Sequence, residues 1–119
     1  MCDSDLYILD VQATIDLLAA TNPLPPMTVS AELELAAIDH CNDTEVNGLV
    51  GHIGTDGTST SHRIKKYANW DFKIGENIRY GNDTARDCVI AWLVDDNKPN
   101  RSHRNNILQL GNSPQLVIV

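Results

Sequence analysis

The sequence predicts an α+β domain in which helices cover a small sheet. Long stretches carry apolar residues at helical spacing, and one segment alternates apolar and polar residues as a strand does. Helical and strand patterns do not alternate regularly, as they would in a parallel α/β protein. The 119 residues, 42% of them apolar, suit a single domain spanning 1–119 with one core.

The first part of the chain predicts two helices joined by an extended linker. Residues 3–20 repeat apolar side chains at helical spacing. Three prolines within 23–26 end this helix and impose an extended backbone. Ser30 is a good N-cap for the second helix, and we expect the polar stretch at 42–48 to end it.

The rest of the chain mixes short helices with two strand candidates. The clearest strand signal is the apolar alternation that ends at Tyr80, and a new helical stripe starts at Ala85. In order, the predicted elements are a Gly-rich loop at 52–61, a short helix at 62–67, a strand at 72–80, a helix at 85–95, a loop at 97–102, a helical turn at 103–108 and a strand at 115–119.

Charge and cysteine content exclude several classes of function. A net charge of -7 argues against a nucleic-acid partner or an anionic membrane surface. The basic cluster Arg63–Lys66 is expected to be a solvated helix face. Cys2, Cys41 and Cys88 fit no zinc or redox spacing, so Cys41 and Cys88 are expected to be small buried hydrophobes. We find no transmembrane segment and no basic start of a signal peptide.

Glu76 is the most informative single residue. It shares one face of an extended segment with Ile74 and Ile78, so its carboxylate is expected to be half buried. Burying an ionised carboxylate without a partner costs on the order of several kcal/mol. The sequence therefore predicts that a cation, a histidine or strong hydrogen-bond donors lie next to Glu76.

Two loop histidines and one aspartate are further site candidates. His52 lies in the Gly-rich loop and His103 begins a turn, and loop histidines carry function more often than core ones. Asp95 ends a helix, where the helix dipole disfavours an anion, so either a site role or a solvated helix end fits it. His40 lies on an apolar helix face and is expected to be a hydrogen-bonded core residue.

The residues alone leave the chemistry open. The histidines and Glu76 lie on separate segments, which is unlike a local metalloprotease motif. A hydrolase could combine Ser61 or Ser102 with a histidine and Glu76, but a surface serine is the simpler interpretation.

Four motifs in order resemble the CAP superfamily, also called the SCP domain family. This family includes cysteine-rich secretory proteins, insect antigen 5 and plant pathogenesis-related proteins, and the resemblance is strongest to short single-domain microbial and protist members. The motifs are GHIGTDGTS at 51–59, RIKKYANW at 63–70, IGENIRYG at 74–81 and WLVDDNKPNRSHRNNIL at 92–108.

The resemblance implies both a fold and a site. The fold is an α-β-α sandwich with a small antiparallel sheet between helices. The site is a cleft in which His52 and His103 bind a divalent metal, with zinc expected, and Glu76 and Asp95 are the cleft acids. The implied role is a secreted or surface binding module, outside the cell, that takes a lipid, a sterol, a peptide or another small molecule.

The chain departs from the family pattern after the last motif. The family usually continues past this motif with a glycine-rich connection and further strands. Here only residues 111–119 remain, so we expect the sheet to lack C-terminal strands. Leu116–Val119 would then offer an open strand edge to a partner protein. Two alternatives to the binding module remain: a His/Glu-dependent, protease-like hydrolase, and a truncated structural or interaction domain without activity. We favour a non-enzymatic role.

Overall fold

The computed structural model describes residues 3–69, 74–110 and 117–118, and it confirms the predicted α+β class. Its elements are α1 (Asp3–Ala20), α2 (Ala31–Asn47), α3 (Thr60–Lys65), β1 (Gly75–Glu76), α4 (Ala85–Val94), α5 (Ser102–Leu108) and β2 (Val117–Ile118).

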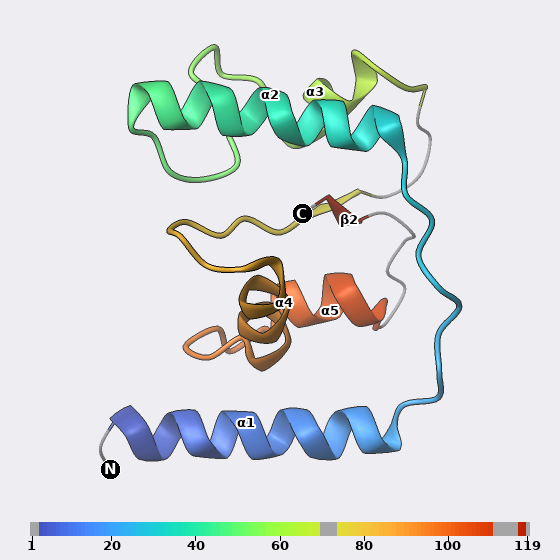
Figure 1. The fold of residues 1–119 in the computed structure, drawn as a ribbon, viewed down its shortest axis with the longest axis vertical. Helices are drawn as coiled ribbons and strands as arrows, with labels where there is room; N and C mark the ends of the chain where they lie inside the picture. The colour runs from blue at the N-terminus through green and yellow to red at the C-terminus, as the bar shows by residue number, and fades with distance from the viewer. Residues whose placement is uncertain (1–2, 70–73, 111–116, 119) are drawn as a thin grey trace.

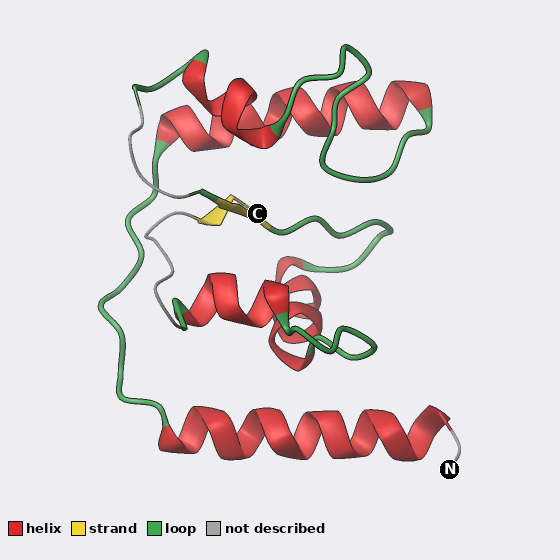
Figure 2. Cartoon of the chain, turned by 180° about the vertical axis from the view of Figure 1, so that it is seen from behind, coloured by secondary structure: helices red, strands yellow, loops and turns green. Residues whose placement is uncertain are grey.

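The elements stack in layers on either side of the strand pair. Figure 1 shows α2 and α3 above the strands, α4 and α5 below them, and α1 at the far end. The linker between α1 and α2 runs the length of the molecule, so these two helices lie at opposite ends (Figures 1 and 2). Among the described helices, none combines the length and the apolar character that a bilayer crossing requires.

The strand pair is parallel, whereas the sequence predicts an antiparallel sheet. Gly75 lies opposite Val117, and Glu76 lies opposite Ile118. The helices α4 and α5 lie between the two strands in the chain and supply the long crossover that a parallel pair requires. Of the strand predicted at 72–80, only Gly75–Glu76 forms a strand, residues 74 and 77–80 are loop, and 72–73 lie outside the described part. Of the strand predicted at 115–119, residues 117–118 form β2, and 115, 116 and 119 lie outside the described part.

The helix ends follow from local capping. The Ser30 hydroxyl accepts a hydrogen bond from the Leu33 N–H, as the sequence predicts. Gly48 ends α2 in the left-handed conformation, with φ of 62°. The polar residues 42–47 therefore continue α2, which ends at the last position of the polar stretch, and within the helix the Thr44 hydroxyl donates to the His40 carbonyl.

The apolar core of the described residues is small. Leu33 and Ala36 of α2 pack on Ile64 of α3, while Trp92 and Val94 of α4 are buried on the other side of the strands. The prediction that Cys41 and Cys88 are buried was wrong, since Cys41 is exposed and Cys88 is half-buried. Both side chains border a pocket, so no packed neighbour covers them fully.

Helix α1 is attached mainly through polar contacts. The Arg101 guanidinium pairs with Asp10, and Arg104 donates to the Thr14 hydroxyl at 2.6 Å. The apolar side chains of α1 remain largely exposed, including Ile8 at 63% and Ile15 at 54%. Direction-specific hydrogen bonds therefore position α1, while apolar burial contributes little.

We expect replacement of Ile64 by Ala to lower the free energy of unfolding by about 2–5 kcal/mol. Ile64 is 0% exposed at the centre of the α2–α3 cluster, so truncation leaves a cavity. Urea denaturation measures the change. Ile8→Ala on exposed α1 is the matched control and is expected to change stability by less than about 1 kcal/mol. Equal losses in both variants would contradict this core assignment.

Candidate functional site

The sequence predicts that a charged or polar partner lies next to Glu76. In the structure this partner is Arg63 of α3. Arg63 Nη2 lies 2.6 Å from Glu76 Oε2, and both side chains are buried, at 4% and 6% exposure. The second oxygen, Oε1, lies 2.7 Å from both His52 Nδ1 and Thr60 Oγ1. The prediction that Arg63 belongs to a solvated face was wrong. Its side chain is buried, where its positive charge neutralises the Glu76 carboxylate.

Arg63 also fixes the Gly-rich loop. Its Nη1 donates to the His52 carbonyl at 3.0 Å and to the Thr58 carbonyl at 3.4 Å. One guanidinium therefore holds the backbone of the loop and the carboxylate of β1 together. The sequence called for a cation, a histidine or donors beside a buried Glu76, but it did not identify Arg63 as that cation.

These contacts set the charge state of Glu76. Burial by itself raises the pKa of this carboxyl, but hydrogen bonds from His52, Thr60 and Arg63, with the Arg63 charge, outweigh it. The pKa of Glu76 is consequently held below its ordinary value of 4.5, and Glu76 is ionised at neutral pH. An ionised, fully bonded carboxylate orients its neighbours and does not donate a proton.

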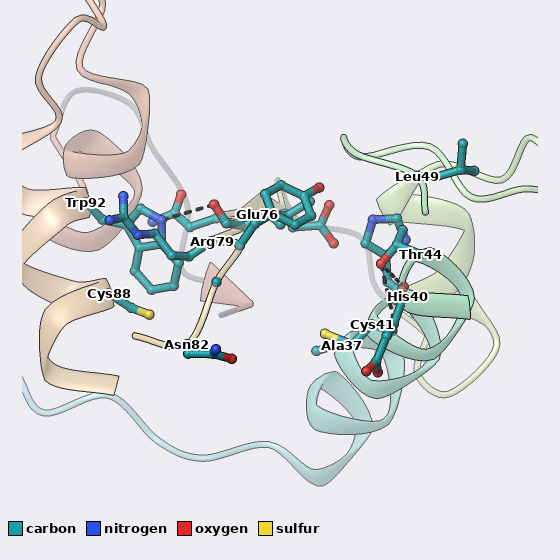
Figure 3. Close-up of a pocket in the computed structure, with 15 residues that line it drawn as sticks. Ala37, His40, Cys41, Thr44, Leu49, Glu76, Arg79, Asn82, Cys88 and Trp92 are labelled. Carbon is teal, nitrogen blue, oxygen red and sulfur yellow. Dashed lines mark hydrogen bonds between the residues drawn. The ribbon is translucent and has the colours of Figure 1, made fainter. Parts of the chain in front are cut away.

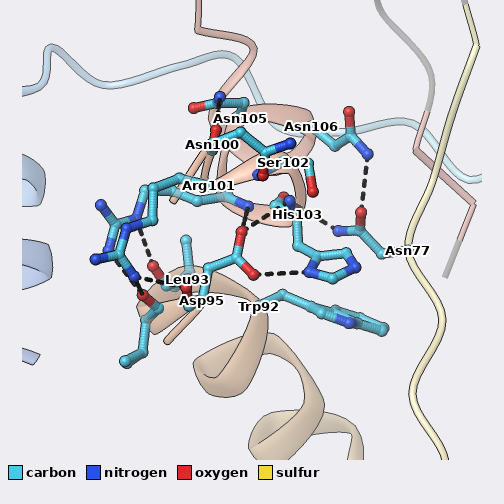
Figure 4. Close-up of polar contacts among 12 residues, drawn as sticks. Asn77, Trp92, Leu93, Asp95, Asn100, Arg101, Ser102, His103, Asn105 and Asn106 are labelled. Carbon is cyan, nitrogen blue, oxygen red and sulfur yellow. Dashed lines mark hydrogen bonds and ion pairs between the residues drawn. The ribbon is translucent and has the colours of Figure 1, made fainter. Parts of the chain in front are cut away.

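Asp95 holds the second predicted histidine. Asp95 Oδ1 lies 2.7 Å from His103 Nδ1, and Oδ2 accepts the backbone N–H groups of His103 and Arg104 at 2.9 and 3.3 Å (Figure 4). The carboxylate therefore caps α5 and orients His103 at once. Asp95 is 3% exposed, whereas the neighbouring Asp96 is exposed. The interpretation as a solvated helix end therefore holds for Asp96 and not for Asp95.

Asn77 connects the two histidine–carboxylate pairs. Its Nδ2 donates to the His103 carbonyl at 3.1 Å, and its Oδ1 accepts from Asn106 Nδ2 at 2.8 Å. A Cβ atom on Gly75 would lie 2.9 Å from Asn106 Cγ, so only glycine lets α5 approach this closely. Gly75, Glu76 and Asn77 thus make three different contacts within one short segment.

The four predicted site residues come together as two pairs beside β1. Glu76 accepts from His52, while the adjacent Asn77 holds the segment that carries His103 and Asp95. A pocket of about 520 Å³ borders Glu76, but neither histidine lines it (Figure 3). Within residues 3–69, 74–110 and 117–118, no group of three or more His, Cys, Asp or Glu side chains is placed to hold a metal ion.

Each pair leaves one imidazole nitrogen for chemistry. A carboxylate accepts a hydrogen bond from Nδ1–H, so a neutral ring with this contact keeps its lone pair on Nε2. Such a nitrogen can accept a proton or ligate a metal. His40 differs, since its Nε2 lies 2.7 Å from the Gly51 carbonyl and its side chain is buried, as predicted for a core histidine.

We expect Arg63→Met to lower the free energy of unfolding by about 3–5 kcal/mol at neutral pH, because it leaves the Glu76 charge buried without its cation. Chemical denaturation measures the loss. The double variant Arg63→Met/Glu76→Gln should lose less than the sum of the single variants. Lys65→Met, on an exposed position of the same helix, is the control and should stay within about 0.5 kcal/mol. An Arg63→Met variant with an unchanged free energy of unfolding would contradict a structural role for this ion pair.

The lowered pKa of Glu76 predicts that the stability of the fold depends on pH. Its folded-state pKa is depressed, so its contribution to stability is present above pH 4.5 and is lost as pH falls through the folded pKa. Stability measured by denaturation from pH 7 to acid should fall less steeply below pH 4.5 in Glu76→Gln than in the unmodified chain. Identical slopes would mean that Glu76 titrates as an ordinary exposed carboxyl.

Comparison with known proteins agrees with the motif pattern. A sequence model of the cysteine-rich secretory protein family, CAP, matches residues 15–113. A search of curated proteins found no match, and a search of solved structures found none.

Proposed function

The chain belongs to the CAP family, the cysteine-rich secretory protein family, and on that premise we propose that it is a binding module in which His52 and His103 hold a divalent metal ion, with zinc preferred. The observation that carries the proposal is the matched pair of contacts, 2.7 Å from His52 Nδ1 to Glu76 and 2.7 Å from His103 Nδ1 to Asp95. Carboxylates that orient imidazoles in this way are the usual neighbours of zinc ligands.

The donor chemistry of this site fits a divalent metal. Both rings are held through Nδ1, which leaves Nε2 as the ligating atom. Glu76 already bonds to Arg63, His52 and Thr60, so its role is to orient His52. A bound ion would supply a Lewis-acid centre whose other positions are open to water or to an oxygen or nitrogen atom of a ligand.

The ligand and the location complete the proposal. We propose that residues 1–119 act as one domain and that a lipid, a sterol, a peptide or another small molecule binds beside the metal. Members of the family are generally extracellular, and we place this chain there also. A protein partner at the C-terminal strand edge belongs to the same proposal.

No contact favours the hydrolase alternative. In the described part of the chain, neither the Ser61 nor the Ser102 hydroxyl bonds to a histidine; the Ser102 backbone N–H bonds to Asn100 instead. Glu76 is held ionised by Arg63, which makes it a poor general acid. A binding role therefore fits these residues better than hydrolysis.

We expect zinc, titrated into the purified protein by calorimetry, to bind at pH 7.5 and to bind less tightly as pH falls, because protonated imidazole cannot ligate. The double variant His52→Ala/His103→Ala should abolish binding. Affinity that survives this double substitution would reject the site.

A matched pair of aspartate variants tests the orienting contact. Asp95→Asn should weaken zinc binding by about 10- to 100-fold, because an uncharged amide with one acceptor oxygen cannot both orient His103 Nδ1 and accept the two backbone N–H groups. Asp96→Asn, at the exposed neighbouring position, should leave the affinity unchanged. Circular dichroism of both variants checks that α5 remains folded after loss of its cap. Equal affinities in the two variants would remove Asp95 from the proposal.

A further inference from the structure

The chain exposes more surface than a compact protein of its mass. Its accessible surface is 8231 Å² for 13.1 kDa. A folded monomer of this mass exposes about 6,400 Å². The radius of gyration, 15.4 Å, likewise exceeds the roughly 13.5 Å expected for a compact domain of this length. The excess of about 1,800 Å² falls within the roughly 1,000–2,500 Å² that each partner buries in an obligate homodimer.

The molecule is thin in the direction in which a sheet would widen. Its extents are 43 × 33 × 23 Å. Figure 1 is viewed down the shortest axis, and in it the layers stack vertically while the strand segment runs across the page. Further strands would therefore add along the 23 Å axis, where strands lie about 4.8 Å apart. Among the described residues, no third strand pairs with β1 or β2.

A groove runs along α2 on this strand side. Two pockets share Ala37 and Cys41 of α2, one of about 520 Å³ and one of about 530 Å³. Together they extend from Met27 in the linker to Leu49 after α2, and we call this surface the α2 groove. Figure 3 shows α2 forming one wall and α4, with Trp92, the other.

The floor of the α2 groove is an unfinished strand. Residues 78–80 continue past β1 and line the groove, but in the described structure only Gly75 and Glu76 pair with another strand. An unpaired strand edge favours an occupant that brings backbone donors and acceptors.

The chemistry of this flank is self-complementary. The same pocket presents an acid, Glu45, and a base, Arg79, which pairs with Asp83 at 2.7 Å, beside the apolar Leu49 and Ile78. Under two-fold symmetry a surface meets itself, so opposite charges on one surface can face each other across the axis. Two-fold symmetry also sets residues 78–80 antiparallel to their counterparts, which is a favourable pairing of edges.

We infer that this flank is the interface of a homodimer, in which the α2 groove and residues 78–80 of one copy meet the same surface of a second copy. The dimer joins two short sheets into one and removes the excess exposed surface from both copies. Neither His52 nor His103 lines the groove, although Glu76, which orients His52, does.

The test uses the whole chain in reducing buffer, so that cysteines cannot link the copies. Light scattering after size-exclusion chromatography should give about twice the 13.1 kDa of one chain. Leu49→Asp places a charge in the α2 groove and should raise the dimer dissociation constant by about thirtyfold or more. Val50→Asp is the matched control: it is the next residue, it is 77% exposed and it does not line the groove, so the dimer should persist.

Two measurements on the unmodified chain keep the inference testable if Leu49→Asp fails to fold. The melting temperature should rise with protein concentration, as mass action requires of a dimer. Amide hydrogen exchange at residues 78–80 should slow as concentration rises. A monomer whose melting temperature is independent of concentration overturns the inference. So does a dimer that responds equally to Leu49→Asp and Val50→Asp, or whose exchange at 78–80 is independent of concentration.

Discussion

The buried ion pair between Arg63 and Glu76 is the interaction on which the rest of this structure depends. It joins three parts of the chain that share no large apolar interface: α3, the Gly-rich loop and β1. Removing either partner leaves a buried charge, which costs about 3–5 kcal/mol, a large share of the stability of a small domain. Since the described residues include only five buried apolar side chains, directional polar contacts determine where these parts lie.

Both carboxylates of the site perform two tasks at once. Glu76 neutralises Arg63 and orients His52, while Asp95 caps α5 and orients His103. Asp95 adopts a left-handed backbone, with φ of 49°, which is uncommon for a residue other than glycine. The imidazole geometry is thus coupled to the integrity of the fold, and a change at either acid alters stability and site together.

Local pattern was enough to predict most helices and the need of Glu76 for a partner, whereas the set of site residues came from the resemblance to the family. Ser30, the prolines and the apolar spacing act within a few residues, so the sequence displays them directly. The burial of Arg63 could not be read in this way, because its partner lies on another element and a charged run usually faces solvent. The parallel strand pair was also missed, since strand direction depends on the α4–α5 crossover and not on either strand.

The attachment of α1 affects how the chain acquires its structure during synthesis. Asp10 and Thr14 bind Arg101 and Arg104, partners that lie 91 and 90 positions later in the chain. At about 5–20 residues per second, the ribosome needs roughly 5–20 s to supply those partners. Within these 119 residues, α1 is therefore synthesised long before the side chains that hold it, so it reaches its final position only after α5 has been made.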